Sequence, residues 1–180
     1  MLVFIYYIFY TEKNAMTLPD QRPRINRSTF DRMAPAVTAA LRALGQAVDD
    51  SGLDKSLTEL IKMRASQINR CVFCIQYHLN MARQLGVSAV KLDLVSAWQE
   101  AGIFSARERA ALAWTEALTL MAGQSVSEAA YAELKAHFAE TEIAFLTAAV
   151  GAINVWNRIA GALHFDPPIP SKQSTPEGLR

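Results

Sequence analysis

The sequence predicts an all-α protein in which short loops join the helices of a single bundle. Three observations favour this fold class. Apolar residues after residue 16 recur at the three- and four-residue spacing of helix faces, and no convincing period-two strand pattern appears. Ser, Pro and Gly fall where helices commonly begin and end. The 180 residues are 51% hydrophobic and 19% charged, which suits one compact domain with its own core.

The first half of the chain contains three predicted helices after an extended lead-in at 17–27. The first has Pro35 in its first turn, precedes Gly52 and carries the apolar stripe Val37, Leu41, Leu44 and Val48. The second carries the stripe Leu57, Leu60, Ile61, Ala65 and Ile68. The third runs from about Cys71 to Leu85, where Gly86 closes it.

The second half of the chain continues the helical pattern. Ser88 is expected to begin a short helix with Leu92, Val95 and Trp98, and Ser127 to precede one with Tyr131, Leu134 and Phe138. Between them, Ser105 and Glu108 have the spacing of a capping box, which opens an Ala-rich helix that ends near Gly123. The last helix carries Ile143, Leu146, Val150, Ile153 and Ala160, and Pro167, Pro168 and Pro170 end it. The expected domain covers 17–166, with a polar tail at 167–180.

Residues 1–16 form a separate apolar extension. The run Met1 to Tyr10 is too short for a membrane-spanning helix and lacks the basic start and cleavage site of a secretory signal. Met16 opens a more ordinary sequence, so we expect the native chain to start there. A β-rich packing arm and a membrane tether are the alternatives.

Charge and cysteine content narrow the function classes. The formal net charge of +1 argues against a nucleic-acid-binding protein, which needs a concentrated basic surface. Cys71 and Cys74 are the only cysteines and are too close in sequence to join distant elements as a disulfide scaffold would. Their role is therefore expected to be chemical, in a reducing cytoplasm that keeps the pair ready.

The segment Cys71-Val72-Phe73-Cys74-Ile75-Gln76-Tyr77-His78 contains the candidate site. On a helix, Cys71, Cys74 and His78 share one face, and that face is apolar. The positive end of the helix dipole favours a thiolate, and a histidine one turn away is placed to take the thiol proton. A second cysteine one turn back is placed to attack a sulfenic acid and form a disulfide. The pattern predicts a thiol peroxidase or dithiol oxidoreductase.

Two other interpretations of the cysteines remain open. The pair could be small buried hydrophobic residues beside a hydrogen-bonded core histidine. The same three side chains could bind a metal if His137, His164 or a carboxylate supplied a fourth ligand. No metal and no cofactor are expected, and a thioredoxin-like fold is excluded because no βαβ pattern is present.

The run from Glu59 to Leu85 resembles the core motif of the alkylhydroperoxidase D-like, carboxymuconolactone decarboxylase superfamily: a Glu, a C-x-x-C a dozen residues later, and a His after three more. Weaker similarity extends over residues 17–165, including the runs 111–117 and 154–158. The resemblance implies an all-helical alkylhydroperoxidase D-like bundle that assembles as trimers or trimer-based hexamers.

The resemblance also implies residue roles. Cys74 is then the peroxidatic sulfur and Cys71 the resolving sulfur, while His78 and Glu59 form a proton relay. The decarboxylase branch generally lacks the cysteine pair, so the pair favours a peroxidase. The implied partners are a hydroperoxide substrate, an external dithiol reductant and further copies of this chain, with no nucleic acid or membrane. A general disulfide oxidoreductase, a decarboxylase and a non-catalytic redox or metal-binding module are the rival functions.

Several residues near the motif are harder to assign. The best-studied peroxidases of the family have a second His immediately before the peroxidatic cysteine, where this chain has Phe73. Helical periodicity alone places Glu59 opposite the apolar stripe, as a solvated carboxylate. Phe73 and Tyr77 suit either a subunit contact or packing against a neighbouring helix. Asn157 suits a structural hydrogen bond or the wall of the active-site pocket.

Overall fold

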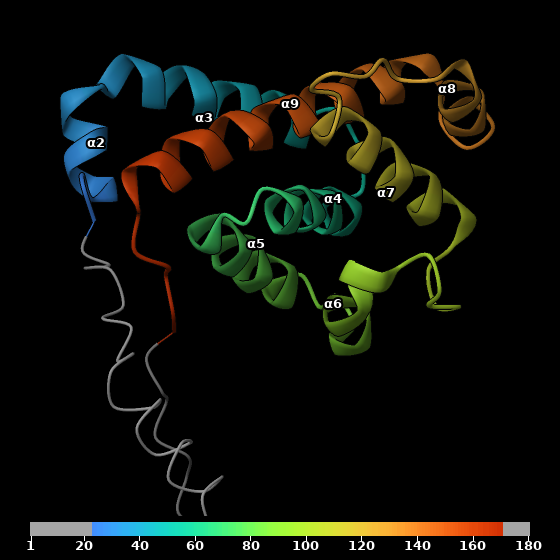
Figure 1. Cartoon of the computed structure of the whole chain (residues 1–180), viewed down its shortest axis with the longest axis horizontal. Coiled ribbons are helices and arrows are strands. Elements are labelled where there is room, and N and C mark those ends of the chain that lie inside the picture. Colours follow the sequence, from blue (N-terminus) through green and yellow to red (C-terminus); the bar gives the residue numbers. More distant parts are fainter. Residues whose placement is uncertain (1–22, 171–180) are drawn as a thin grey trace, which may run out of the picture.

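A computed structural model describes residues 23–170, and every regular element within that range is a helix (Figure 1). In chain order these are α2 (Arg27–Met33), α3 (Pro35–Asp49), α4 (Lys55–Ile68), α5 (Val72–Gln84), α6 (Ala89–Leu94), the 3-10 turn η1 (Val95–Ala97), α7 (Ala106–Thr119), α8 (Glu128–Lys135) and α9 (Glu140–Leu163). The all-α prediction is confirmed. The expectations for Met16, the extension at 1–16 and the tail beyond residue 170 lie outside the described residues.

Most helix boundaries follow the predicted capping residues, but α7 ends at Thr119 instead of near Gly123, and α2 was not predicted from the sequence. The capping box is present at α7: the Glu108 amide donates to Ser105 Oγ at 3.2 Å, and the Ser105 amide donates to Glu108 Oε2 at 2.8 Å. Gly52 and Gly86, which follow α3 and α5, have φ values of +87° and +76°. Only glycine adopts this left-handed region without a steric cost, which explains why both helices end there.

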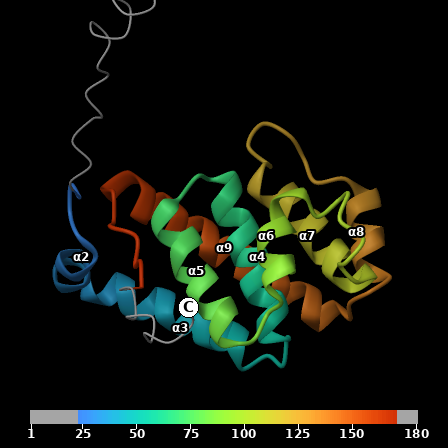
Figure 2. The same cartoon turned by 90° about the horizontal axis from the view of Figure 1, so that it is seen from below.

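Helix α4 lies at the centre of the bundle. It packs against α5, α7, α9 and η1, so neighbouring helices cover it on nearly all sides (Figure 2). Glu59 is therefore only 6% exposed, and Met63 and Ser66 beside it are also buried. The prediction of a solvated Glu59 from periodicity is wrong, because a central helix has no solvent face for a polar stripe to occupy.

Helix α9 is the longest element and forms the other main part of the core. It contacts α3, α4, α5 and α7. By length and composition α9 could cross a membrane. In this structure its inward face, including Leu146, Val150 and Ile153, packs inside the bundle, so α9 serves as a core helix. Trp98 and Trp114 are also core residues.

The apolar stripe of α3 is only partly covered. Val48 is 1% exposed, whereas Val37 is 47% and Leu44 is 38% exposed. Within the described residues α3 packs mainly against α9, which runs alongside it, and against α2, which lies at its N-terminal end (Figure 1). The chain therefore presents an uncovered apolar surface at Val37 and Leu44.

Candidate active site

The two cysteines lie at the sharp corner between α4 and α5. Arg70 makes the corner with a φ of +54°, a left-handed conformation that is unusual for a residue with a side chain. The Cys71 amide then donates to the carbonyl of Ser66 at 3.0 Å, and Cys71 becomes the N-terminal cap of α5. This geometry directs both thiols toward α9.

The thiols are in contact with each other and are shielded from solvent. Their Sγ atoms are 2.8 Å apart, and each cysteine is only 2% exposed. Both are free thiols, and they pack with Ala65, Ile153, Ala160 and Phe165. The predicted proximity of the two sulfurs is confirmed, and one turn of helix suffices to bring them together.

The environment makes the two sulfurs unequal acids. The pKa of Cys71 is lowered to about 7, chiefly by a hydrogen bond from the Cys74 thiol; the amides of Cys74 and Phe73 also lower it, and burial opposes them. The hydrogen bond to Cys71, burial and the charge on Cys71 all raise the pKa of Cys74. The first proton to leave the pair therefore leaves the negative charge on Cys71, because the free amides of the α5 N-terminus face that sulfur.

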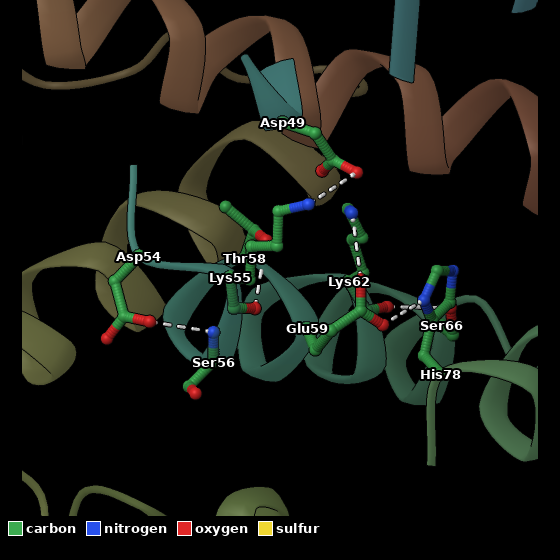
Figure 3. A network of polar contacts seen from close by, with 9 residues as sticks. All are labelled: Asp49, Asp54, Lys55, Ser56, Thr58, Glu59, Lys62, Ser66 and His78. Atoms are coloured by element: carbon green, nitrogen blue, oxygen red, sulfur yellow. Dashed lines mark hydrogen bonds and ion pairs between the residues drawn. The ribbon is translucent and has the colours of Figure 1, made fainter. Parts of the chain in front are cut away.

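A largely buried ion-pair network joins α4 to α5 (Figure 3). Glu59 Oε2 is 2.6 Å from His78 Nδ1, and Glu59 Oε1 accepts a hydrogen bond from Lys62 Nζ at 2.9 Å. Burial raises the pKa of Glu59, but His78 and Lys62 lower it by more, so the carboxyl group is ionised. An ionised Glu59 holds the proton of His78 on Nδ1 and leaves Nε2 for proton exchange.

The predicted relay pair Glu59–His78 is thus formed across α4 and α5. Within residues 23–170, His78 makes no direct hydrogen bond to either thiol. Instead, His78 and Cys74 both line one cavity. A proton passing between them would travel through a molecule held in that cavity.

A buried amide network, which sequence reasoning found only in part, supports the cysteine corner. Asn157, on α9, is 4% exposed. Its Oδ1 accepts a hydrogen bond from Asn69 Nδ2 at 2.9 Å, and its Nδ2 donates to Ser66 Oγ at 3.0 Å. A hydrogen bond from Asn157 also lowers the pKa of both thiols. The structural hydrogen bond considered for Asn157 is thus present, but the residue is not a wall of either cavity at the thiols.

The cavity over Cys74 has a volume of about 520 Å³ and combines residues from distant parts of the sequence. Its apolar walls are Phe73, Tyr77, Trp156 and Pro168, and its charged rim is Arg27, Asp31 and Arg42. The rim comes from α2 and α3. No local motif indicates these three residues, because only the packing of α2 and α3 near α9 brings them to the site.

A second cavity, of about 300 Å³, reaches Cys71 from the other side. Phe73 lines both cavities and packs edge-on against Phe165, with ring centroids 5.4 Å apart. Phe73 therefore separates the two cavities that lead to the thiol pair. Tyr77, which stacks on Phe73, is 45% exposed.

The other two histidines make no contact with the thiols. His137 Nε2 is 3.4 Å from Glu133 Oε1, four residues earlier on α8 and its C-terminal turn. His164 is exposed and borders the smaller cavity. Among the described residues, no three His, Cys, Asp or Glu side chains are grouped to bind a metal ion.

Comparison with known proteins gives consistent matches. The model of the carboxymuconolactone decarboxylase family matches residues 35–117. The uncharacterized protein YdfG of Bacillus subtilis is 31% identical over 137 residues, which cover 76% of this chain and 93% of YdfG. Among solved structures, a protein of unknown function from Agrobacterium tumefaciens, provisionally named as the antioxidant defence protein AhpD, is 38% identical with a TM-score of 0.78, covering 83% of this chain and 100% of that one.

A more distant structure shares the fold only. The debrominase Bmp8, in a C82A variant bound to 2,3,4-tribromopyrrole, is 20% identical with a TM-score of 0.69. The match covers 85% of this chain and 79% of Bmp8. The fold thus accommodates more than one kind of chemistry.

Proposed function

This chain belongs to the carboxymuconolactone decarboxylase family, within the alkylhydroperoxidase D-like superfamily, and from that premise we propose that it reduces hydroperoxides through Cys71 and Cys74. One observation carries the proposal. Two free thiols in contact lie beside an ionised Glu59–His78 pair, and Cys74 and His78 line the same cavity. The presence of both cysteines favours a peroxidase over a decarboxylase.

The first step forms a sulfenic acid on Cys74. In the pair that has lost one proton, the thiolate is on Cys71 and the remaining proton is on Cys74. That proton passes from Cys74 to Cys71 across the 2.8 Å contact, and the Cys74 thiolate attacks the outer oxygen of the peroxide. The O–O bond breaks, Cys74 becomes Cys–SOH, and the alkoxide leaves. His78, entering this step with protons on both ring nitrogens, gives the alkoxide the proton on Nε2, and the neutral ring that remains keeps its other proton on Nδ1 against the Glu59 carboxylate.

The second step closes the disulfide. Cys71 attacks the Cys74 sulfur, the S–S bond forms, and the hydroxyl group leaves as water with the Cys71 proton. An external dithiol then reduces the disulfide: its two thiols become one disulfide, and both cysteines regain their hydrogens.

The pKa values of the two thiols alone would also fit the opposite assignment, in which the peroxide oxidises Cys71 first and Cys74 then forms the disulfide. We assign peroxide attack to Cys74 because it shares the larger cavity with His78, the proton donor that the leaving alkoxide needs. The smaller cavity gives access to Cys71 but contains neither His78 nor Glu59.

The test is peroxide consumption with dihydrolipoamide or dithiothreitol as reductant, for wild type, Cys74→Ser and Cys71→Ser. Both variants should lose turnover. A sulfenic-acid-trapping dione followed by mass spectrometry should label Cys74 in Cys71→Ser, and Cys71 should stay unlabelled in Cys74→Ser. The reverse labelling would exchange the two roles. If the wild type were as inactive as the two variants, the peroxidase proposal would be wrong.

The rival functions give different results in the same preparation. A decarboxylase would survive replacement of both cysteines, and a metal-binding module would contain close to one metal ion per chain. A general disulfide oxidoreductase would catalyse thiol–disulfide exchange without consuming peroxide. The shared fold with Bmp8 and the aromatic walls of the cavity favour one further candidate, thiol-dependent debromination of flat aromatic compounds, which bromide release would detect.

A further inference from the structure

The cavity over Cys74 is amphipathic in a way that peroxide reduction alone does not require. Resting on the peroxidase proposal, we infer that its substrates are organic hydroperoxides with an apolar body and a carboxylate, and that Arg27 and Arg42 bind the carboxylate. Hydrogen peroxide would need neither the apolar walls nor the cationic rim. The volume of about 520 Å³ lies in the range of small-molecule sites.

The apolar part of the substrate has a defined place. Phe73 and Tyr77 stack with their centroids 6.1 Å apart and an interplanar angle of 20°, and Trp156 on α9 forms a third aromatic wall. These aromatic surfaces meet next to Cys74. A substrate body that fills this space removes apolar surface from water and holds the hydroperoxide near the sulfur.

Contacts with Trp156 and Asp31 fix the position of the Arg27 guanidinium group. Its guanidinium carbon lies 4.4 Å from the centroid of Trp156, and its Nε donates to both oxygens of Asp31 at 3.0 Å. Within residues 23–170 its two terminal nitrogens make no hydrogen bond. A guanidinium fixed through Nε and its ring face is preorganised to present those nitrogens to a carboxylate.

Arg42 adds a second cation to the same rim. Its side chain is 67% exposed, and its contact with Asp31 Oδ2 is 3.5 Å. Burial raises the pKa of Asp31, but hydrogen bonds from Arg27 and Thr38 lower it by more, so Asp31 is ionised. Two guanidinium groups against one carboxylate leave an excess of one positive charge at the rim, which favours an anionic substrate group.

The decisive comparison uses two hydroperoxides that differ in charge and by one methyl group: para-carboxycumene hydroperoxide and its methyl ester. For the wild type we expect kcat/KM for the acid to exceed that for the ester by about tenfold, the typical effect of charge-assisted hydrogen bonds at a partly exposed site. This ratio compares two substrates on one protein, so it does not depend on the fraction of active enzyme.

Variants of Arg27 and Arg42 test whether these two residues cause the preference for the acid. Arg42→Ala and Arg27→Gln should each lower the acid-to-ester ratio several-fold toward one. Arg32→Ala is the matched control, because Arg32 is an exposed arginine on α2 that does not line the cavity, and its ratio should equal that of the wild type. A ratio near one in the wild type, or an equal loss in the control, would overturn the inference while leaving the peroxidase proposal intact.

Binding of an unreactive analogue separates the two proposals further. Calorimetry with para-isopropylbenzoate and its methyl ester needs no turnover. If the wild type binds the acid several-fold more tightly than the ester and Arg42→Ala does not, the carboxylate site stands even if no peroxide is consumed. Equal affinity for acid and ester would contradict it even in an active peroxidase.

Discussion

At the residue scale, Glu59 shows why the site was only partly predictable. Its position in the motif indicated a relay, whereas helical periodicity indicated solvent. The structure supports the motif, because α4 is enclosed and Glu59 has both His78 and Lys62 as partners. Periodicity reports one buried face and so fails for a helix covered on several sides. Cys71, Cys74 and His78 were predictable because their contacts are one turn apart.

Glu59→Gln tests the relay. The amide keeps the shape but loses the charge that orients His78, so peroxidase turnover should fall by roughly a hundredfold, within the usual range of acid–base catalysis. Stability should also fall near neutral pH by about 1–3 kcal/mol. Glu59 has a lowered pKa in the folded state, so its contribution is present above its unfolded pKa and disappears as pH falls through the folded value.

Urea denaturation at neutral and acidic pH measures that stability difference. The gap between wild type and Glu59→Gln should shrink in acid. Glu100→Gln, an exposed carboxylate outside the site, is the control and should match the wild type at both pH values. A gap that is the same at both pH values would mean that the Glu59 charge does not stabilise the fold.

At the element scale, most helices other than α2 were predictable from the sequence, whereas the helices that each of them packs against were not. The capping residues Ser105 and Glu108 and the terminal glycines act within a few residues, so sequence alone locates them. The uncovered stripe of α3 is different, since periodicity identifies an apolar face without stating what covers it. The homo-oligomer expected from the family resemblance stays a prediction, and this face is its natural test.

Val37→Lys combined with Leu44→Glu should dissociate an oligomer formed through α3. Both side chains are more than a third exposed and point to the uncovered flank, so charges there should cost little in the folded monomer but should oppose apolar association. Sedimentation velocity should show a smaller species than the wild type. Gln46→Lys, an exposed polar position on the same helix, should leave the wild-type mass unchanged. A monomeric wild type would contradict the expected assembly.

At the scale of the whole molecule, the site is a product of tertiary packing. The thiols come from one short segment, but the cavity over Cys74 needs α2, α3, α5, α9 and the residues after α9. Arg27 and Pro168 are far apart in sequence and meet only because the chain returns to the same end of the bundle. This is why the sequence indicated the reacting atoms and did not indicate the substrate-binding walls.

The segment after α9 provides a test of that packing. Pro168 lines the larger cavity, its carbonyl accepts a hydrogen bond from Asn80 Nδ2 at 2.8 Å, and Pro167 lines the smaller one. Ending the chain after Asp166 should therefore open both approaches to the thiols while the helices remain. Alkylation of the reduced thiols by iodoacetamide should become several-fold faster, and the far-ultraviolet circular dichroism should stay helical. A chain that ends after Pro170 keeps both prolines and should react at the wild-type rate. Equal rates in all three proteins would mean that this segment does not shield the site.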